Sequence, residues 1–120
     1  MSIHNVFPKL VRYPIDPTCQ LVAKVLIGDG QRGGWAIGFD DAKAQKGSAE
    51  DPVPIGVGKD IRGDLLQIVV TVVDVRPETN RLSCTVGIAG GPSGPVEVKQ
   101  AFDGGADGDT AIFTTLVQLQ

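Results

Sequence analysis

Residues 65–75, LLQIVVTVVDV, would carry apolar side chains on both faces of an extended chain. Alternate residues of a strand point to opposite faces. One face of this segment is wholly aliphatic: Leu66, Ile68, Val70 and Val72. The other is aliphatic apart from Gln67 and Thr71: Leu65, Val69, Val73 and Val75. The pattern predicts a strand that needs cover from both sides.

A turn and a second strand follow this segment. In residues 76–81 (RPETNR), Pro77 suits the first central position of a type I turn, and Asn80 tolerates the left-handed conformation that often follows. Residues 82–88 (LSCTVGI) then alternate between an apolar face and a small or polar one. We therefore expect a β-hairpin whose second strand has a solvent-exposed outer face.

Further strands are predicted at residues 20–27, 35–39, 53–57, 96–102 and 110–119. The Gly-rich residues 28–34 predict a hairpin turn, and Pro52 and Pro54 restrict the 53–57 strand to a sheet edge. Residues 40–46 could form one short helix, capped by Asp40, or a loop.

Together these segments predict an all-β, antiparallel β-sandwich of about seven to eight strands, Greek-key or jelly-roll-like. We expect a single domain over residues 1–120 with an extended N-terminal arm at 1–19. A parallel sheet would need crossover helices, for which the chain has no room.

Composition narrows the class of protein. Of the 120 residues, 42% are hydrophobic and 21% charged, which is typical of a globular domain. The formal charge of −3 and scattered basic residues argue against nucleic-acid binding. The sequence has no apolar run of membrane-spanning length and no ordinary signal peptide, so we expect a cytoplasmic protein, with signal-independent export left open.

The two cysteines, Cys19 and Cys84, have no CxxC neighbour. We favour two reduced, buried thiols over a disulfide or a reactive thiol.

The second apolar face of residues 65–75 is the main functional clue, because a two-layer sandwich buries one face of each strand. The last strand repeats the pattern with Ile112 and Leu116. Either residues 40–54 or the N-terminal arm folds over this face, or it is a subunit interface. The predicted interface residues are Leu65, Val69, Val73, Val75, Ile112 and Leu116.

Ligand binding is the alternative. Asp103, Asp107 and Asp109 in the loop DGGADGD could offer oxygen ligands to Ca²⁺, helped by Asp29 or Asp40 and Asp41 if loops cluster at one end. Gly and Asp also favour turns for conformational reasons alone. Trp35 and Tyr13 could stack on a carbohydrate, although a core role suits Trp35 better.

No catalytic constellation is legible. His4 is the only histidine, and Ser93 lacks the nucleophile-elbow pattern. The GxGxxG of Gly28, Gly30 and Gly33 precedes a strand rather than the helix that a dinucleotide site needs. We predict a non-enzymatic interaction or assembly module that needs no cofactor and self-associates or joins a larger protein assembly. The alternative is a sandwich that holds Ca²⁺ or carbohydrate at its Gly/Asp-rich loops.

Overall fold

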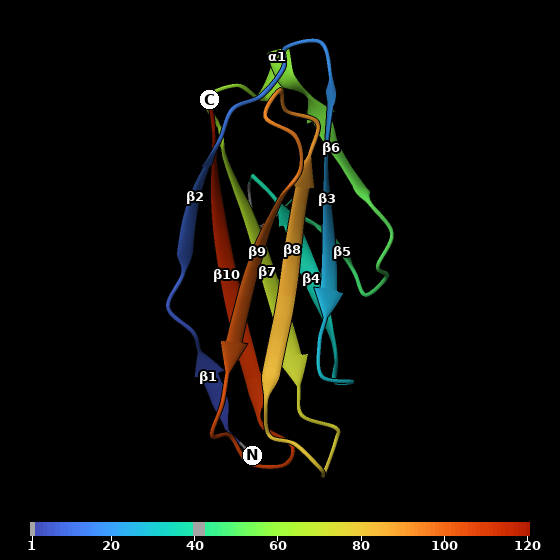
Figure 1. Ribbon diagram of the computed structural model, residues 1–120, viewed down its shortest axis with the longest axis vertical. Helices are drawn as coiled ribbons and strands as arrows, with labels where there is room; N and C mark the ends of the chain where they lie inside the picture. Colours follow the sequence, from blue (N-terminus) through green and yellow to red (C-terminus); the bar gives the residue numbers. More distant parts are fainter. Residues whose placement is uncertain (1, 40–42) are drawn as a thin grey trace.

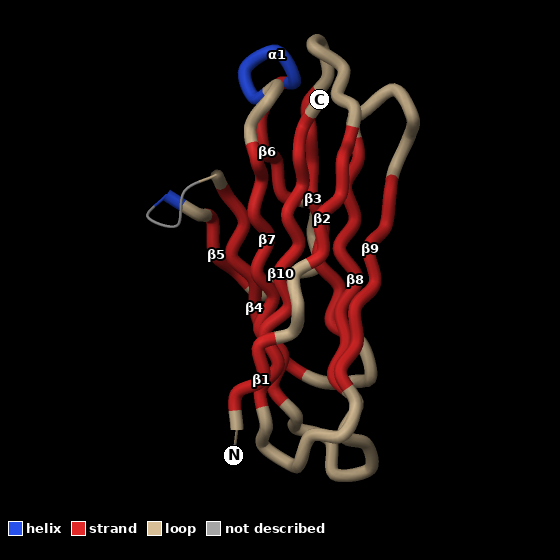
Figure 2. The backbone as a smooth tube through the Cα atoms, turned by 90° about the vertical axis from the view of Figure 1, so that its left-hand side faces the viewer, coloured by secondary structure: helices blue, strands red, loops and turns tan. Residues whose placement is uncertain are grey.

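The computed structural model describes residues 2–39 and 43–120 and shows an all-β sandwich of two packed sheets (Figures 1 and 2). Sheet A has the order β1-β10-β7-β4-β5, with β2 also paired to β10, and sheet B has the order β6-β3-β8-β9. The strands of sheet A are β1 (Ile3–Asn5), β2 (Lys9–Tyr13), β4 (Arg32–Gly38), β5 (Gln45–Gly47), β7 (Leu65–Val73) and β10 (Thr110–Leu119). The strands of sheet B are β3 (Gln20–Ile27), β6 (Val53–Val57), β8 (Leu82–Ala89) and β9 (Val96–Phe102).

The core lies between the inner faces of the two sheets, as the alternation predicted. The predicted inner residues of β7 are completely buried: Leu66, Ile68, Val70 and Val72. The facing residues of β8 are also buried: Leu82, Cys84, Val86 and Ile88. Each large aliphatic side chain buried here contributes about 1.5–3 kcal/mol of transfer free energy. This shared core fixes the two sheets against each other.

The two predicted hairpins are wrong, because their strands lie in different sheets. β7 belongs to sheet A and β8 to sheet B, and β3 and β4 are divided in the same way. Both members of each pair have an apolar face, and the structure places those faces in opposite layers of the core. The turn residues fit a connection between layers as well as a hairpin.

Gln31 joins the two crossing loops at one end of the sandwich. The side chain is buried, and its Oε1 accepts hydrogen bonds from the amides of Val75 (2.7 Å) and Arg76 (3.0 Å). Its Nε2 donates to Asp74 Oδ1 at 3.2 Å and lies within hydrogen-bond distance of the Thr79 and Arg81 carbonyls. One amide side chain from the β3–β4 loop therefore satisfies the backbone of the β7–β8 loop, which has no ladder partner there.

The N-terminal arm contributes two strands to sheet A, which the sequence analysis did not predict. β1 and β2 run parallel to β10, the only parallel pairs among the described strands. These strands lie at opposite ends of the chain, so the whole intervening domain serves as the connection and no crossover helix is needed. Tyr13 is buried and bridges the sheets: its hydroxyl donates to the Gly94 carbonyl (2.7 Å) and accepts from the Gly91 amide (2.9 Å).

For residues 40–46 the sequence left a short helix or a loop open, and the described part runs into a strand. Residues 40–42 lie outside the described residues, and Gln45–Gly47 forms β5 at the edge of sheet A. The one α-helix in the described chain is the short α1, Gly58–Ile61. β6 lies at the edge of sheet B, as Pro52 and Pro54 predicted. No helix among the described residues is long and apolar enough to cross a membrane.

The close contact of β4 with β7 predicts an asymmetry between two glycines. A Cβ at Gly33 would overlap the backbone carbonyl oxygen of Thr71, whereas a Cβ at Gly87 would find its nearest neighbour at 3.9 Å. We expect Gly33→Ala to lower the free energy of unfolding by at least about 2 kcal/mol, because the strands must shift to admit the methyl group. Gly87→Ala, the matched control, should change it by less than about 0.5 kcal/mol. Denaturant unfolding of both variants tests this, and equal effects would contradict the described β4–β7 contact.

The cysteines differ in environment, which corrects the prediction of two buried thiols. Both are free, Cys84 is buried in the core and Cys19 is exposed. Burial raises the pKa of Cys84 to about 12. An aromatic disulfide reagent at neutral pH should therefore modify Cys19 alone in the native protein and both thiols in denaturant. Cys19→Ser should abolish the native reaction; a residual fast thiol in that variant would show that Cys84 is accessible.

Candidate functional site

The outer face of sheet A gathers aliphatic side chains from several strands. Residues that are partners across adjacent strands project to the same face. Ile112 of β10 pairs with Thr71 of β7, and Leu116 pairs with Gln67. On the other side of β7, Val69 pairs with Ala36. The sequence-predicted residues Leu65, Val69, Val73, Ile112 and Leu116 therefore share one surface, which we call the A face.

The A face is only partly covered by the rest of the chain. Val69, Val73, Ile112 and Leu116 are half-buried, and Leu65 is 44% exposed. Neither predicted cover lies across it: the N-terminal arm lines the edge of β10, and residues 43–54 lead through β5 at the opposite edge (Figure 2). The partial burial of these side chains comes from the neighbouring strands of sheet A rather than from a covering loop.

One predicted interface residue lies off this face. Val75 follows the end of β7, in the loop that crosses to β8, and its amide is held by Gln31. It is 46% exposed and borders a recess with Arg76 and Pro77.

Two members of the A face were missed by sequence reasoning. Ile3 is 69% exposed and pairs with Thr110, while Leu10 is 61% exposed and pairs with Leu116. Phe7, between β1 and β2, is 88% exposed. The alternation within KLVRY was the available signal, since it places Leu10 opposite to Val11 and Tyr13. The parallel pairing with β10 thus extends the apolar surface over a further strand.

Among the described strand residues, the charged side chains that project to the A face are all basic. Arg12 pairs with Gln118, Arg32 with Val73 and Lys46 with Ala36, and all three cations are exposed. Across the described strands of both sheets, Glu97 is the one acidic residue, and it lies in sheet B. The described strands therefore give the A face three positive charges, although the whole chain carries a formal charge of −3.

The carboxylates proposed as calcium ligands are distributed among other partners. Asp103 Oδ2 lies 3.1 Å from Arg81 Nη1, and Arg81 Nε lies 3.4 Å from Asp29 Oδ2. Loops carrying Asp29 and Asp103 do meet at one end, but they surround a guanidinium group. Asp107 is exposed and borders the recess that Asp74 also lines. Within residues 2–39 and 43–120, no group of three or more His, Cys, Asp or Glu side chains is arranged to hold a metal ion.

Asp109 ties the N-terminal segment to the β9–β10 loop. Its carboxylate is buried and accepts hydrogen bonds from the amides of Ala106 (2.9 Å) and Ser2 (2.8 Å), and it lies 2.8 Å from His4 Nε2. The His4 ring also stacks on Phe102 with centroids 4.4 Å apart. These contacts place β1, and with it Ile3, at the edge of the A face.

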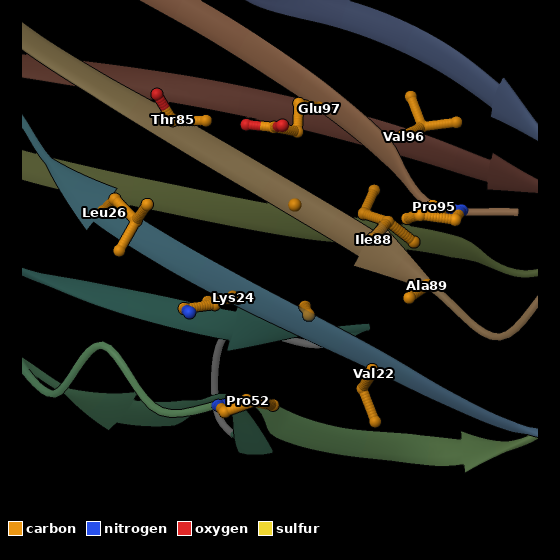
Figure 3. A pocket seen from close by; sticks show the side chains of 12 residues that line it. Val22, Lys24, Leu26, Pro52, Thr85, Ile88, Ala89, Pro95, Val96 and Glu97 are labelled. Carbon is orange, nitrogen blue, oxygen red and sulfur yellow. The ribbon is translucent and has the colours of Figure 1, made fainter.

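A shallow groove crosses the outer face of sheet B and was not predicted. It has a volume of about 340 Å³ and runs over β8 between β3 and β9, with Lys24 and Glu97 on opposite sides (Figure 3). Gly87 of β8 lies between these two residues, which are its partners on β3 and β9. The sequence signal for this groove was a difference in size: the outward residues of β8 are small, whereas those of the neighbouring β3 are larger. The groove is open and holds few polar groups, so it lacks the convergent polar set of a typical small-molecule site.

The aromatic residues considered for carbohydrate stacking have structural partners. Trp35 Nε1 donates a hydrogen bond to the Ala49 carbonyl (2.9 Å), and its ring lies against Gly47 of β5. Tyr13 is fully buried. Tyr13 lies on β2 and Trp35 on β4, with β10 and β7 between them in sheet A, so the two rings form no common platform.

No protein-family model, curated protein or solved structure was found to match the chain.

The Asp109 contacts predict a specific acid dependence. Hydrogen bonds from the Ala106 amide, the His4 side chain and the Ser2 amide lower the pKa of Asp109 from 3.8 to about 2. Because the folded pKa lies below the unfolded one, this carboxylate stabilises the fold above about pH 4 and loses that contribution as pH falls toward 2. Asp109→Asn should therefore flatten the loss of stability between pH 4 and 2.

Asp107→Asn, in the same loop, is the matched control because Asp107 makes no hydrogen bond to the described residues. Chemical denaturation at a series of pH values measures both variants. An unchanged acid limb in Asp109→Asn would contradict the role given to this carboxylate.

Proposed function

We propose that the chain is a non-enzymatic protein-interaction and assembly module, and that it docks through the A face against a second copy or another component of an assembly. The observation that supports this is the uncovered aliphatic surface that extends from Ile3 and Leu10 across β10 and β7. Large exposed apolar patches on monomeric proteins generally mark contacts.

The geometry of the A face suits packing of one flat surface on another. Its central positions carry short side chains of similar height, Val69, Thr71 and Thr114 among them, on paired β7 and β10. Sheets pack face to face about 10 Å apart when such side chains interdigitate. A docked partner would bury the parts of these side chains that sheet A leaves exposed to solvent.

Other uses of the structure have weaker support. Of the loop carboxylates of the calcium hypothesis, Asp103 and Asp109 are engaged with Arg81, His4 and backbone amides. Among the described side-chain hydrogen bonds, hydroxyl groups donate to carboxylates at Ser83–Asp29 and Thr18–Asp16, but neither pair includes a histidine.

Self-association in high salt tests the proposal, because salt screens charge and strengthens apolar burial. At about 1 M sodium chloride the Debye length is roughly 3 Å, so the basic side chains have little influence. We expect the wild-type mass from light scattering to rise with concentration under these conditions. The double variant Val73→Thr with Leu116→Gln should associate at least about tenfold more weakly, because it removes apolar surface from the centre of the interface.

The matched control is Val22→Thr with Leu26→Gln, which makes the same change on partly exposed residues of sheet B. It should associate as the wild type does. Both variants should keep the wild-type free energy of unfolding within about 1 kcal/mol, since the substituted side chains lie outside the core. A wild type that stays monomeric throughout, or equal association of the two variants, would refute the use of the A face.

A further inference from the structure

The three cations of the A face lie around its periphery. Arg12 is on β2 at one edge of the sheet, Lys46 is on β5 at the other edge, and Arg32 begins β4 (Figure 1). None of the three side chains makes an ion pair within the described part of the chain. The uncharged centre, from Val69 to Leu116, lies between them. We call these three residues the basic rim.

The basic rim opposes the docking of a second copy face to face. Two stacked A faces would bring like charges to the border of one interface, and like-charge juxtaposition disfavours a pairing. At about 0.1 M salt the Debye length is about 10 Å, which is close to the separation of packed sheets, so the repulsion would persist. Carboxylates that face the same three positions would turn this repulsion into attraction.

Building on the proposed function, we propose that the partner of the A face is a protein surface with a flat apolar centre and a border of carboxylates, rather than a second copy of this chain. The apolar centre supplies the burial, and the basic rim selects the acidic border.

A protein surface fits better than an anionic lipid bilayer. The central side chains Val69, Ile112 and Leu116 are half-buried within the sheet, whereas the more exposed Ile3 and Leu10 lie on the edge strands β1 and β2.

A charge-reversed copy of this chain can act as the acidic-bordered probe. The rim variant carries Arg12→Glu, Arg32→Glu and Lys46→Glu and keeps the same apolar centre. Mixed with the wild type at about 0.1 M salt, it should form a one-to-one heterodimer in sedimentation velocity, at least about tenfold tighter than wild-type self-association.

The matched control reverses three exposed cations elsewhere: Lys24→Glu, Lys99→Glu and Lys59→Glu. Both triple variants have the same formal charge, so a difference between them reports the position of the charges. The control should not pair with the wild type. A second variant, Arg12→Gln with Arg32→Gln and Lys46→Gln, should self-associate at about 0.1 M salt more tightly than the wild type, because it lacks the repulsion.

Several outcomes would overturn the inference. One is equal pairing of the rim and control variants with the wild type, or no pairing of the rim variant. Another is wild-type self-association at about 0.1 M salt as tight as that of the neutralised variant. If the wild type binds to phosphatidylcholine vesicles containing phosphatidylserine and the rim variant does not, the basic rim would be assigned to a lipid surface. When one of these outcomes occurs but the wild type self-associates through the A face at about 1 M salt, the inference alone fails and the proposed function stands.

Discussion

The structure depends on one constraint: β7 is apolar on both faces and lies at the centre of sheet A, between β10 and β4. Its inner side chains, from Leu66 to Val72, are fully buried against sheet B and determine which way every paired neighbour faces. Once that register is set, Ile112 and Leu116 of β10 must lie beside Val69 and Val73 on the opposite side. The core and the exposed apolar surface are therefore two consequences of the same strand.

The loops at one end show how the chain passes between layers without leaving polar groups unpaired. β3 and β7 both lead into connections that cross the sandwich, and Gln31 binds the backbone of the second connection from within the first. Local sequence could not reveal this arrangement. The turn residues Pro77 and Asn80 specify a change of direction, while the choice between hairpin and crossing is decided by which pairing buries the apolar faces of β7 and β8.

Alternation was a reliable guide wherever a strand is long. The buried set of β7 and the inward residues Phe113, Val117 and Leu119 of β10 follow from it directly. It failed for the N-terminal arm, because β1 and β2 are short and gain stability from β10, a strand about a hundred positions away in the chain. The sequence could not reveal the partners of the loop carboxylates for a related reason. Asp103 and Asp109 contact Arg81, His4 and Ser2, which only the fold brings near.

Net charge is a poor guide to the surface that a partner would meet. The chain is acidic overall, yet strand periodicity places Arg12, Arg32 and Lys46 on the A face, while acidic residues other than Glu97 fall outside the described strands. Loops tolerate Asp because its side chain satisfies turn amides, whereas strands disfavour it. The long stems of Arg and Lys can lie along apolar surface with their charges at its border. The same propensities that build the sandwich therefore give its open face a charge opposite to that of the whole chain.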